Sequence, residues 1–465
     1  MKLYSEGKNY KLYQGSMLDM LEVIEPNSVD SIITDPPYEL NFMGKGWDNS
    51  GIAFQPDTWR KCYEVLKPGG YLLAFGGSRT FHRIACAIED AGFEIRDTIM
   101  WLYGMGFPKS MNIGLMMDKK EGLQKHRGKA IDTAGKGTRK DIETNFEVKP
   151  AYTDYKSDLA KQWQGWGTAL KPSFEPIIVA RKPFKGSLVD NVIEHGVGGI
   201  NIDECRVEYA NDSDKKFHKK EIDRVLRVKT PFNNSWKNCS NLNNANPQNE
   251  QGRFPANTIL TYDETDFDEV CGGFPNTKNS KRSSKYNKDT VYTNTYTPPK
   301  AIYTENNTYG DSGSASRYFY CAKASKKDRD EGLDELESKP MYVADNEHGN
   351  LGAMYVKKAG GEIGDTQLRK NTHPTVKPTE LMQYLIRLVS PNGATILDPF
   401  NGSGSTGKAV MYENRERNAN YKYIGIELTE EYLPISKARI EYVCNLKEEV
   451  NPQMSIFDLL ESKGE

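Results

Sequence analysis

The chain has 465 residues, 37% of them hydrophobic, and a formal net charge of −2. This length allows a large core together with a second domain. The balanced charge excludes a molecule that is basic all over, so a nucleic-acid partner would have to be met by a local basic patch. No apolar run is long enough to span a membrane and the first residues form no signal peptide, which predicts a cytoplasmic protein without a membrane partner.

The seven cysteines lie far apart and form no Cys-x-x-Cys pair, and the six histidines are equally scattered. Such spacing favours reduced thiols over disulfides. It also gives no cluster of metal ligands, so we expect no metal site.

The chain opens with a predicted strand at 11–13 and a helix that Ser16 can cap. Asp19 falls in the first turn of that helix, where the helix dipole favours a carboxylate. The next apolar run ends in a buried strand at 31–34, because prolines stop it directly afterwards.

The loop after this strand reads Asp35-Pro36-Pro37-Tyr38. Pro36 and Pro37 have no backbone N–H and a fixed φ, so the ladder of the sheet stops there and the loop is stiff. A carboxylate and an aromatic ring then stand at the carboxyl end of a strand, where open α/β sheets bind ligands. Asp35 and the carbonyl of Pro36 could accept both hydrogens of a nucleobase amino group, and Tyr38 could stack on the base. An ordinary strand-terminating turn is the alternative.

These four residues resemble the Asp-Pro-Pro-Tyr motif of the DNA amino-methyltransferases. That family transfers a methyl group from S-adenosylmethionine to N6 of adenine or N4 of cytosine, and aspartate in first place is typical of its adenine enzymes. The resemblance implies that residues 35–38 are catalytic, that Asp35 also borders the cofactor, and that Asp19 binds the cofactor's adenine amino group.

Strands and helices then alternate, which predicts parallel βα units and a Rossmann-like, doubly wound, mostly parallel sheet. The predicted helices lie at 59–66 and 78–91, and the predicted strands at 71–75, 93–101 and 177–180. Residues 119–149 are charged and lack periodicity, which indicates an exposed insertion.

Residues 201–311 are polar and carry two basic clusters, at 215–227 and 278–286. Charge runs are usually solvated, but the family's target-recognition region commonly lies at this position. The resemblance therefore implies a double-stranded DNA partner and three domains: a catalytic half at 1–200, a target-recognition insert at 201–315 and a cofactor-binding half at 316–465. A strand at 316–323, a surface helix at 325–333 and a loop at 342–371 are predicted after the insert.

A second glycine-rich loop follows a predicted helix at 379–389 and a buried strand at 395–398. Glycines let the backbone approach a ligand, and the helix predicted to begin at Thr406 would offer N–H donors. The loop resembles the family's Asp-Pro-Phe-x-Gly-x-Gly motif. The resemblance implies that the following residues bind S-adenosylmethionine: Asp398 facing the methionine ammonium, Phe400, Gly402 and Gly404 lining the turn, Thr406 beginning the helix, and Lys377 beside the methionine end.

Glu427 ends the next predicted strand, where an acid can accept both ribose hydroxyls of a nucleotide cofactor. The alternative is a surface glutamate that caps the next helix. Residues 402–408 also match the phosphate-binding Gly-x-x-x-x-Gly-Lys of nucleotide hydrolases, but Ala409 stands where that motif needs Ser or Thr for magnesium.

A catalytic loop that precedes the cofactor loop resembles the beta group of DNA amino-methyltransferases, including bacterial and phage-encoded members. The resulting hypothesis is site-specific methylation of adenine N6 in duplex DNA, with base flipping. Cytosine N4 methylation, a non-catalytic DNA-binding protein and a nucleotide hydrolase are the alternatives. A homodimer and an accompanying restriction endonuclease stay open as partners.

Overall fold

The computed structural model describes residues 2–40, 50–103, 110–123, 155–209, 252–262, 276–277, 313–314, 319–323, 326–340, 342–344, 351–353, 355–357, 363–366 and 368–446. The chain divides into two compact units. The larger consists of Met1–Gly104 and Phe174–Glu465, and the smaller of Met105–Ser173.

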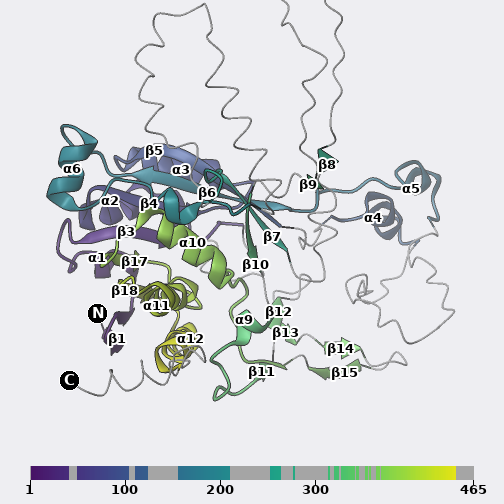
Figure 1. Cartoon of the computed structure of the whole chain (residues 1–465). Helices are drawn as coiled ribbons and strands as arrows, with labels where there is room; N and C mark the ends of the chain where they lie inside the picture. The colour runs from purple at the N-terminus through teal and green to yellow at the C-terminus, as the bar shows by residue number, and fades with distance from the viewer. Residues whose placement is uncertain are drawn as a thin grey trace, which may run out of the picture. The chain divides into compact units, whose positions relative to one another are not determined.

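A ten-stranded sheet organises the larger unit (Figure 1), in the order β1-β2-β18-β17-β3-β4-β6-β5-β7-β10. Six of the nine neighbouring pairs are parallel, and the three antiparallel pairs involve only β1 with β2 and β6 with its two neighbours. The strands are β1 (Lys2–Gly7), β2 (Tyr10–Gln14), β3 (Val29–Thr34), β4 (Leu66–Phe75), β5 (Glu94–Tyr103), β6 (Phe174–Arg181), β7 (Thr258–Tyr262), β10 (Tyr320–Lys323), β17 (Thr395–Asp398) and β18 (Lys422–Glu427).

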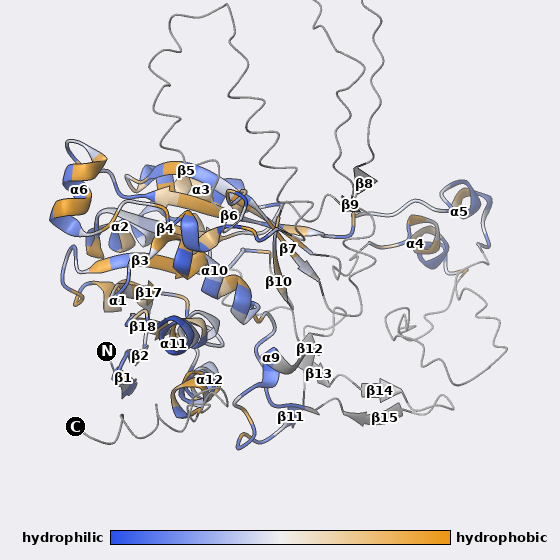
Figure 2. Ribbon diagram, in the orientation of Figure 1, coloured by the Kyte–Doolittle hydropathy of each residue, from blue (hydrophilic) through white to orange (hydrophobic). Residues whose placement is uncertain are grey.

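Successive side chains of the central strands enter two different hydrophobic cores, because a strand points alternate residues to opposite faces. Ile33 and Leu73 lie in one core, whereas Ile32 and Leu72 lie in the other. Hydrophobic residues accordingly concentrate on the central strands (Figure 2). Both faces of the sheet are therefore buried.

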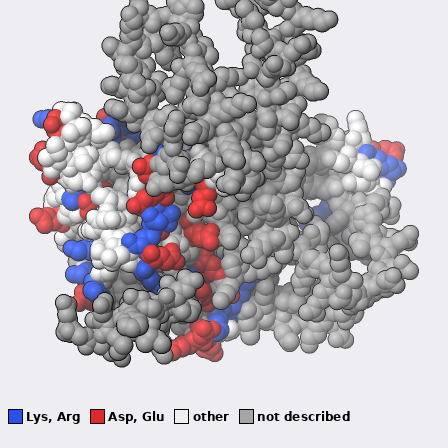
Figure 3. Space-filling model, viewed as in Figure 1, with Lys and Arg blue, Asp and Glu red and all other residues white. Residues whose placement is uncertain are grey.

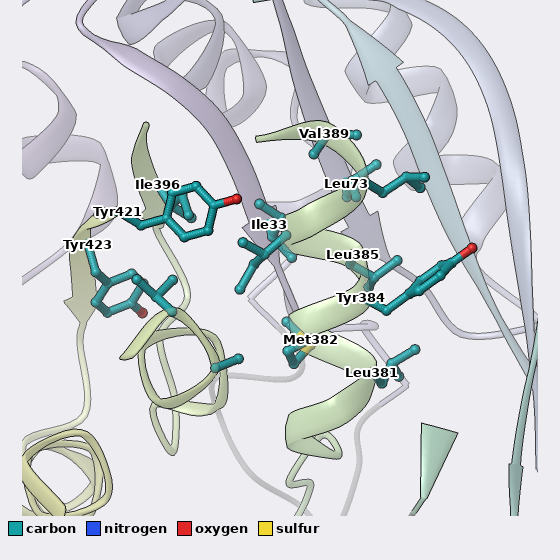
Figure 4. Packing of buried hydrophobic residues seen from close by; sticks show 14 of the residues in the cluster. Ile33, Leu73, Leu381, Met382, Tyr384, Leu385, Val389, Ile396, Tyr421 and Tyr423 are labelled. Atoms are coloured by element: carbon teal, nitrogen blue, oxygen red, sulfur yellow. The ribbon is translucent and has the colours of Figure 1, made fainter. Parts of the chain in front are cut away.

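Helices cover each face. The core that contains Ile33 is completed by α10 (Thr379–Val389), α11 (Ser405–Arg417) and α12 (Leu433–Asn445). Figure 4 shows side chains of α10, among them Leu381 and Leu385, in this core together with Ile33 and Leu73. The core that contains Ile32 is completed by α1 (Met17–Leu21), α2 (Pro56–Val65) and α3 (Phe81–Asp90). The predicted doubly wound, mostly parallel α/β fold is confirmed.

The predicted insert at 201–315 needs a correction, because Thr258–Tyr262 forms β7 of the main sheet and pairs in parallel with β5 and β10. Two buried residues, Ile259 and Leu260, are too short an apolar run to be recognised within so polar a stretch. The strand predicted at 316–323 does join the sheet, as β10. Both basic clusters lie outside the described residues. On the face shown in Figure 3, the described lysines and arginines are interspersed with acidic residues.

Two further predictions downstream need correction: one helix is present but partly buried, and one loop contains strands. The predicted surface helix is α9 (Lys326–Asp330), but Leu333 just beyond it is fully buried and Asp328 forms ion pairs with the buried side chains of Lys408 and Arg439. The predicted loop at 342–371 contains short antiparallel pairs instead: β12 (Tyr342–Ala344) with β13 (Leu351–Ala353), β14 (Tyr355–Lys357) with β15 (Ile363–Thr366), and β16 (Leu368–Arg369) with β11 (Lys339–Pro340).

The remaining elements of the larger unit are short. They are η3 (Ile52–Phe54), α6 (Leu188–His195), η4 (Asp203–Cys205), β8 (Asn276–Thr277), β9 (Gly313–Ser314) and η7 (Glu430–Tyr432). Among the described residues, no helix is both long and apolar enough to cross a membrane.

The smaller unit contains α4 (Ile113–Lys120) and α5 (Asp158–Gln162). Asp118 is buried and accepts hydrogen bonds from the backbone of Lys156 and from Ser157, which ties the two helices together. The sequence placed this segment in the catalytic half, but it folds as a compact unit of its own. Most of the predicted exposed insertion at 119–149 lies outside the described residues.

Candidate active site

The two loops predicted to carry the chemistry follow neighbouring parallel strands, β3 and β17. The carboxyl ends of parallel strands meet at one edge of a sheet, so both loops open on the same edge. The Thr34 hydroxyl, at the end of β3, donates to Asp398 Oδ1 at the end of β17 at 2.7 Å. Segments more than 360 residues apart in the sequence therefore build one site.

Only one of the two carboxylate oxygens of Asp35 accepts a hydrogen bond among the described residues. Its Oδ2 accepts a hydrogen bond from Lys377 Nζ at 2.5 Å. Its Oδ1 is shielded from solvent and has no hydrogen-bond partner among the described residues. A buried polar oxygen without a partner is costly, so such an atom marks a place where a ligand can donate. Pro36 and Pro37 are buried and hold this carboxylate in place.

Lys377 is buried and lies between two carboxylates, 2.5 Å from Asp35 and 3.5 Å from Glu175. Burial alone would lower the pKa of Lys377, but the charges of Asp35 and Glu175 outweigh it and raise that pKa, so the side chain stays protonated. It is therefore a buried charge of the site and not a lysine that solvent surrounds. The structure places its ammonium group against Asp35 of the loop at 35–38, and its place beside the methionine end of the cofactor stays a prediction.

Glu175 is a site residue that the sequence reasoning missed. It lies at the start of β6, which runs antiparallel between β4 and β5, so its side chain reaches the edge where those two strands end. The hydroxyl of Tyr38 donates to Glu175 Oε2 at 2.8 Å, and that of Tyr103 donates to Oε1 at 3.3 Å. An acid directly before a buried proline and an apolar strand was the available signal.

The backbone of the glycine loop packs tightly against neighbouring side chains at residues 402 and 404. Gly402 has a φ of +51°, and a Cβ there would lie 2.8 Å from His373 Nε2. Gly404 has a φ of +75°, and a Cβ there would meet Ser436 Oγ. Only glycine combines this conformation with such close packing. Gly404 precedes α11 as its N-cap, so the helix begins at Ser405, one residue before the predicted Thr406.

Asp398 lies beneath this loop with both oxygens engaged. Oδ1 accepts from Thr34 and from the backbone N–H of Phe400 at 3.1 Å, and Oδ2 accepts from the Thr406 hydroxyl at 2.6 Å. Burial raises the pKa of Asp398 to about 7, although these hydrogen bonds act in the opposite direction. The half-buried ring of Phe400 lies 6.4 Å from that of Trp59.

Glu427 ties the end of β18 to the glycine loop. Its Oε2 accepts from the backbone N–H of Gly402 at 2.7 Å and its Oε1 from that of Thr429 at 2.7 Å. Burial raises its pKa. It is therefore no surface glutamate. Asp19 is exposed in the first turn of α1, and that helix starts beside Glu427 because Gly15 N–H donates to the Glu427 carbonyl at 3.0 Å.

The segment 371–378 connects the two loops. The His373 ring packs against Gly402, while Lys377 four residues later binds Asp35. His373 Nδ1 lies 2.6 Å from the carbonyl of Thr375, so that nitrogen carries the proton and donates. Burial lowers the pKa of His373 to about 4, which keeps the ring neutral near pH 7.

Lys408 is fully buried and turned away from any phosphate-binding position. Its Nζ lies 2.5 Å from Asp328 Oδ1 and 2.8 Å from Glu331 Oε2. A lysine of a phosphate-binding loop has to reach the phosphates of its nucleotide. These two ion pairs contradict the nucleotide-hydrolase alternative.

The family model described as DNA methylase matches residues 29–438, which include both loops and every strand from β3 to β18. The chain belongs to this family.

Similar proteins include two type II methyltransferases. M2.DpnII of Streptococcus pneumoniae is 41% identical over 224 residues, which cover 43% of this chain and 82% of that protein. M.HindIII of Haemophilus influenzae is 28% identical over 232 residues, which cover 41% of this chain and 64% of that protein. Among solved structures, the cytosine-N4-specific PvuII DNA methyltransferase has 12% identity and a TM-score of 0.39, covering 97% of this chain and 92% of that one.

The residues of this DNA methylase fit S-adenosylmethionine. Positions 402 and 404 form a cradle that any Cβ would fill, so the backbone there can lie close to a ligand. Asp398 and Glu427 are buried acids at the ends of two adjacent strands, suited to an ammonium group and to ribose hydroxyls respectively. Among the described residues, no group of three or more His, Cys, Asp or Glu side chains could hold a metal ion.

Proposed function

We propose that this DNA methylase transfers a methyl group from S-adenosylmethionine to the N6 amino group of adenine in duplex DNA. The unpartnered Oδ1 of Asp35 carries the proposal. It is an acceptor held rigidly behind two buried prolines, with the other oxygen of the same carboxylate fixed by Lys377.

An exocyclic amino group is a poor nucleophile because its lone pair is delocalised into the base. Asp35 Oδ1 and the carbonyl of Pro36 would accept its two hydrogens and turn the lone pair out of the ring plane. Tyr38, with its hydroxyl held by Glu175, would stack on a base that is flipped out of the duplex. The chain thereby positions the amino nitrogen for attack.

The glycine loop would hold the cofactor. Gly402, Gly404 and the first turn of α11 would hold its methionine portion, with Asp398 facing the ammonium and Phe400 lining the turn. Glu427 would accept the ribose hydroxyls, and Asp19 would bind the adenine end. When bound, S-adenosylmethionine supplies the electrophilic methyl group that the amino nitrogen attacks.

We assign target recognition to the parts of 201–315 that flank β7, where both basic clusters occur. Lysine and arginine side chains position a protein on the phosphates, and polar side chains among them read base edges. Mutating either cluster should weaken DNA binding and reduce its dependence on salt concentration.

Adenine is favoured over cytosine because aspartate stands in first place of the Asp-Pro-Pro-Tyr motif. The deciding experiment transfers labelled methyl groups to unmethylated DNA and analyses the product nucleosides. We expect N6-methyladenine. N4-methylcytosine would keep the mechanism and change the base, whereas unlabelled DNA together with intact cofactor binding would overturn the proposal.

A further inference from the structure

We propose that Glu175 gives the target-base site a net charge of −1, and that this charge stabilises the positive charge that the amino nitrogen acquires during methyl transfer. The inference rests on the proposed function. It adds a residue that belongs to neither loop motif and contacts Lys377 and Tyr38.

The charge follows from the ion pairs. A single lysine, Lys377, faces the carboxylates of Asp35 and Glu175. Lys377 is buried, and the two acids are about four-fifths buried, with 22% and 21% of their side chains exposed. No other cation among the described residues forms an ion pair with either acid. Without Glu175 the pair of Asp35 and Lys377 would be neutral, so Glu175 contributes the uncompensated negative charge.

Methyl transfer moves a positive charge toward this group. As the amino nitrogen forms its bond to the methyl carbon, the bond from that carbon to sulfur breaks and the electron pair stays on sulfur. The nitrogen carries the positive charge until it releases one proton to solvent. A fixed negative charge in a partly buried site favours that state more than it would in water.

Glu175 also orients the ring that meets the base. The pKa of Tyr38 is raised well above 10, first by burial and then by the charges of Asp35 and Glu175, so its hydroxyl stays protonated and donates to Glu175. The ring also lies 5.4 Å from Lys377 Nζ. Loss of the hydrogen bond would let the ring move, whereas loss of the charge alone would leave it in place. The two effects can therefore be separated.

The test compares Glu175→Gln, Glu175→Asp and Tyr103→Phe with the wild type. Gln keeps an oxygen that can accept from Tyr38 but carries no charge, and Asp keeps the charge on a shorter side chain. The hydroxyl of Tyr103 donates to Glu175, and among the described residues it forms no hydrogen bond with Asp35 or Lys377, so its variant is the matched control. Single-turnover methyl transfer is measured at saturating DNA and S-adenosylmethionine, with both dissociation constants and the melting temperature.

We expect Glu175→Gln to slow transfer by about 10- to 100-fold while both dissociation constants change by about twofold or less. Glu175→Asp should be faster than Glu175→Gln, and Tyr103→Phe should stay close to wild type. A wild-type rate for Glu175→Gln would overturn the inference. So would an Asp variant as slow as the Gln variant with binding intact, or a Gln variant that loses binding and stability together. A wild type that leaves DNA unmethylated would instead refute the proposed function.

Discussion

The loops that follow β3 and β17 lie at the same edge of the sheet, but they treat their carboxylates differently. Asp398 accepts three hydrogen bonds from its own chain, and Glu427 beside it accepts two backbone N–H groups. Asp35 leaves an oxygen without a partner. The carboxylates at the glycine loop are thus fully hydrogen-bonded within the chain, whereas the loop at 35–38 keeps an acceptor, which the proposed function assigns to the substrate.

Two buried lysines sharpen this contrast. Lys377 and Lys408 each face two carboxylates. Around Lys408 the acid Asp328 also accepts from the backbone N–H and the hydroxyl of Thr379 at the start of α10, so both of its carboxylate oxygens have partners within the scaffold. The same residue types serve structure in one place and chemistry in the other, and the unpartnered oxygen of Asp35 distinguishes them.

The largest expected effect concerns the support beneath the glycine loop. Lys408→Met removes the buried cation of Glu331 and leaves Asp328 with Arg439 alone, which should lower the free energy of unfolding by about 3–5 kcal/mol. Lys437→Met is the control, because Lys437 is an exposed lysine at 3.8 Å from Glu441 and should cost about 1 kcal/mol or less. Chemical denaturation measures both. A stable Lys408→Met protein that loses a nucleotide-hydrolase activity would revive the phosphate-loop alternative.

A smaller effect is expected within the glycine loop itself. Gly402→Ala places a methyl group 2.8 Å from His373 Nε2, so the loop must shift, and affinity for S-adenosylmethionine should fall by about tenfold. Gly393→Ala is matched, since Gly393 has a φ of +80° but nothing within 4 Å of the added carbon. Calorimetric titration should find its affinity near wild type. Equal losses in both variants would mean that backbone strain, and not the close approach, matters.

The smallest effect is a pH dependence of cofactor affinity. Because the pKa of Asp398 is raised to about 7, its carboxyl becomes neutral as pH falls below that value. A cofactor ammonium favours the ionised form, so affinity should weaken below pH 7 by up to about tenfold per pH unit. Titrations between pH 6 and 8 measure this slope, which Asp398→Asn should remove. A slope that persists in Asp398→Asn would assign the dependence to another group.

Cofactor affinity is the better observable for this pH dependence, because Asp398 and His373 change the free energy of unfolding in opposite directions as pH changes. A raised pKa means that Asp398 binds its proton more tightly in the native protein than in the unfolded chain. The contribution of Asp398 to the free energy of unfolding therefore falls as pH rises from about 4 to 7. His373 has a lowered pKa of about 4, so the unfolded chain takes up its proton first and stability is lost as pH falls from about 6.5 to 4.

The sequence predicted the two loops and the fold class because each loop is a short contiguous pattern that follows an apolar strand. It could not predict Glu175, whose role appears only when antiparallel β6 brings it to the edge beside Tyr38. Nor could it predict the partner of Lys377, because Asp35 lies 342 residues away in the chain. Local patterns encode loops, whereas partners across the sheet depend on strand order.

The most direct test of this division between the loops compares Asp35→Asn with Asp398→Asn, measuring S-adenosylmethionine binding and single-turnover transfer to DNA in each. We predict that Asp35→Asn slows transfer by at least about 1,000-fold and leaves cofactor affinity within about threefold of wild type. Asp398→Asn should weaken cofactor binding first. An Asp35→Asn protein that still transfers methyl groups at the wild-type rate, or that loses the cofactor as Asp398→Asn does, would contradict the account.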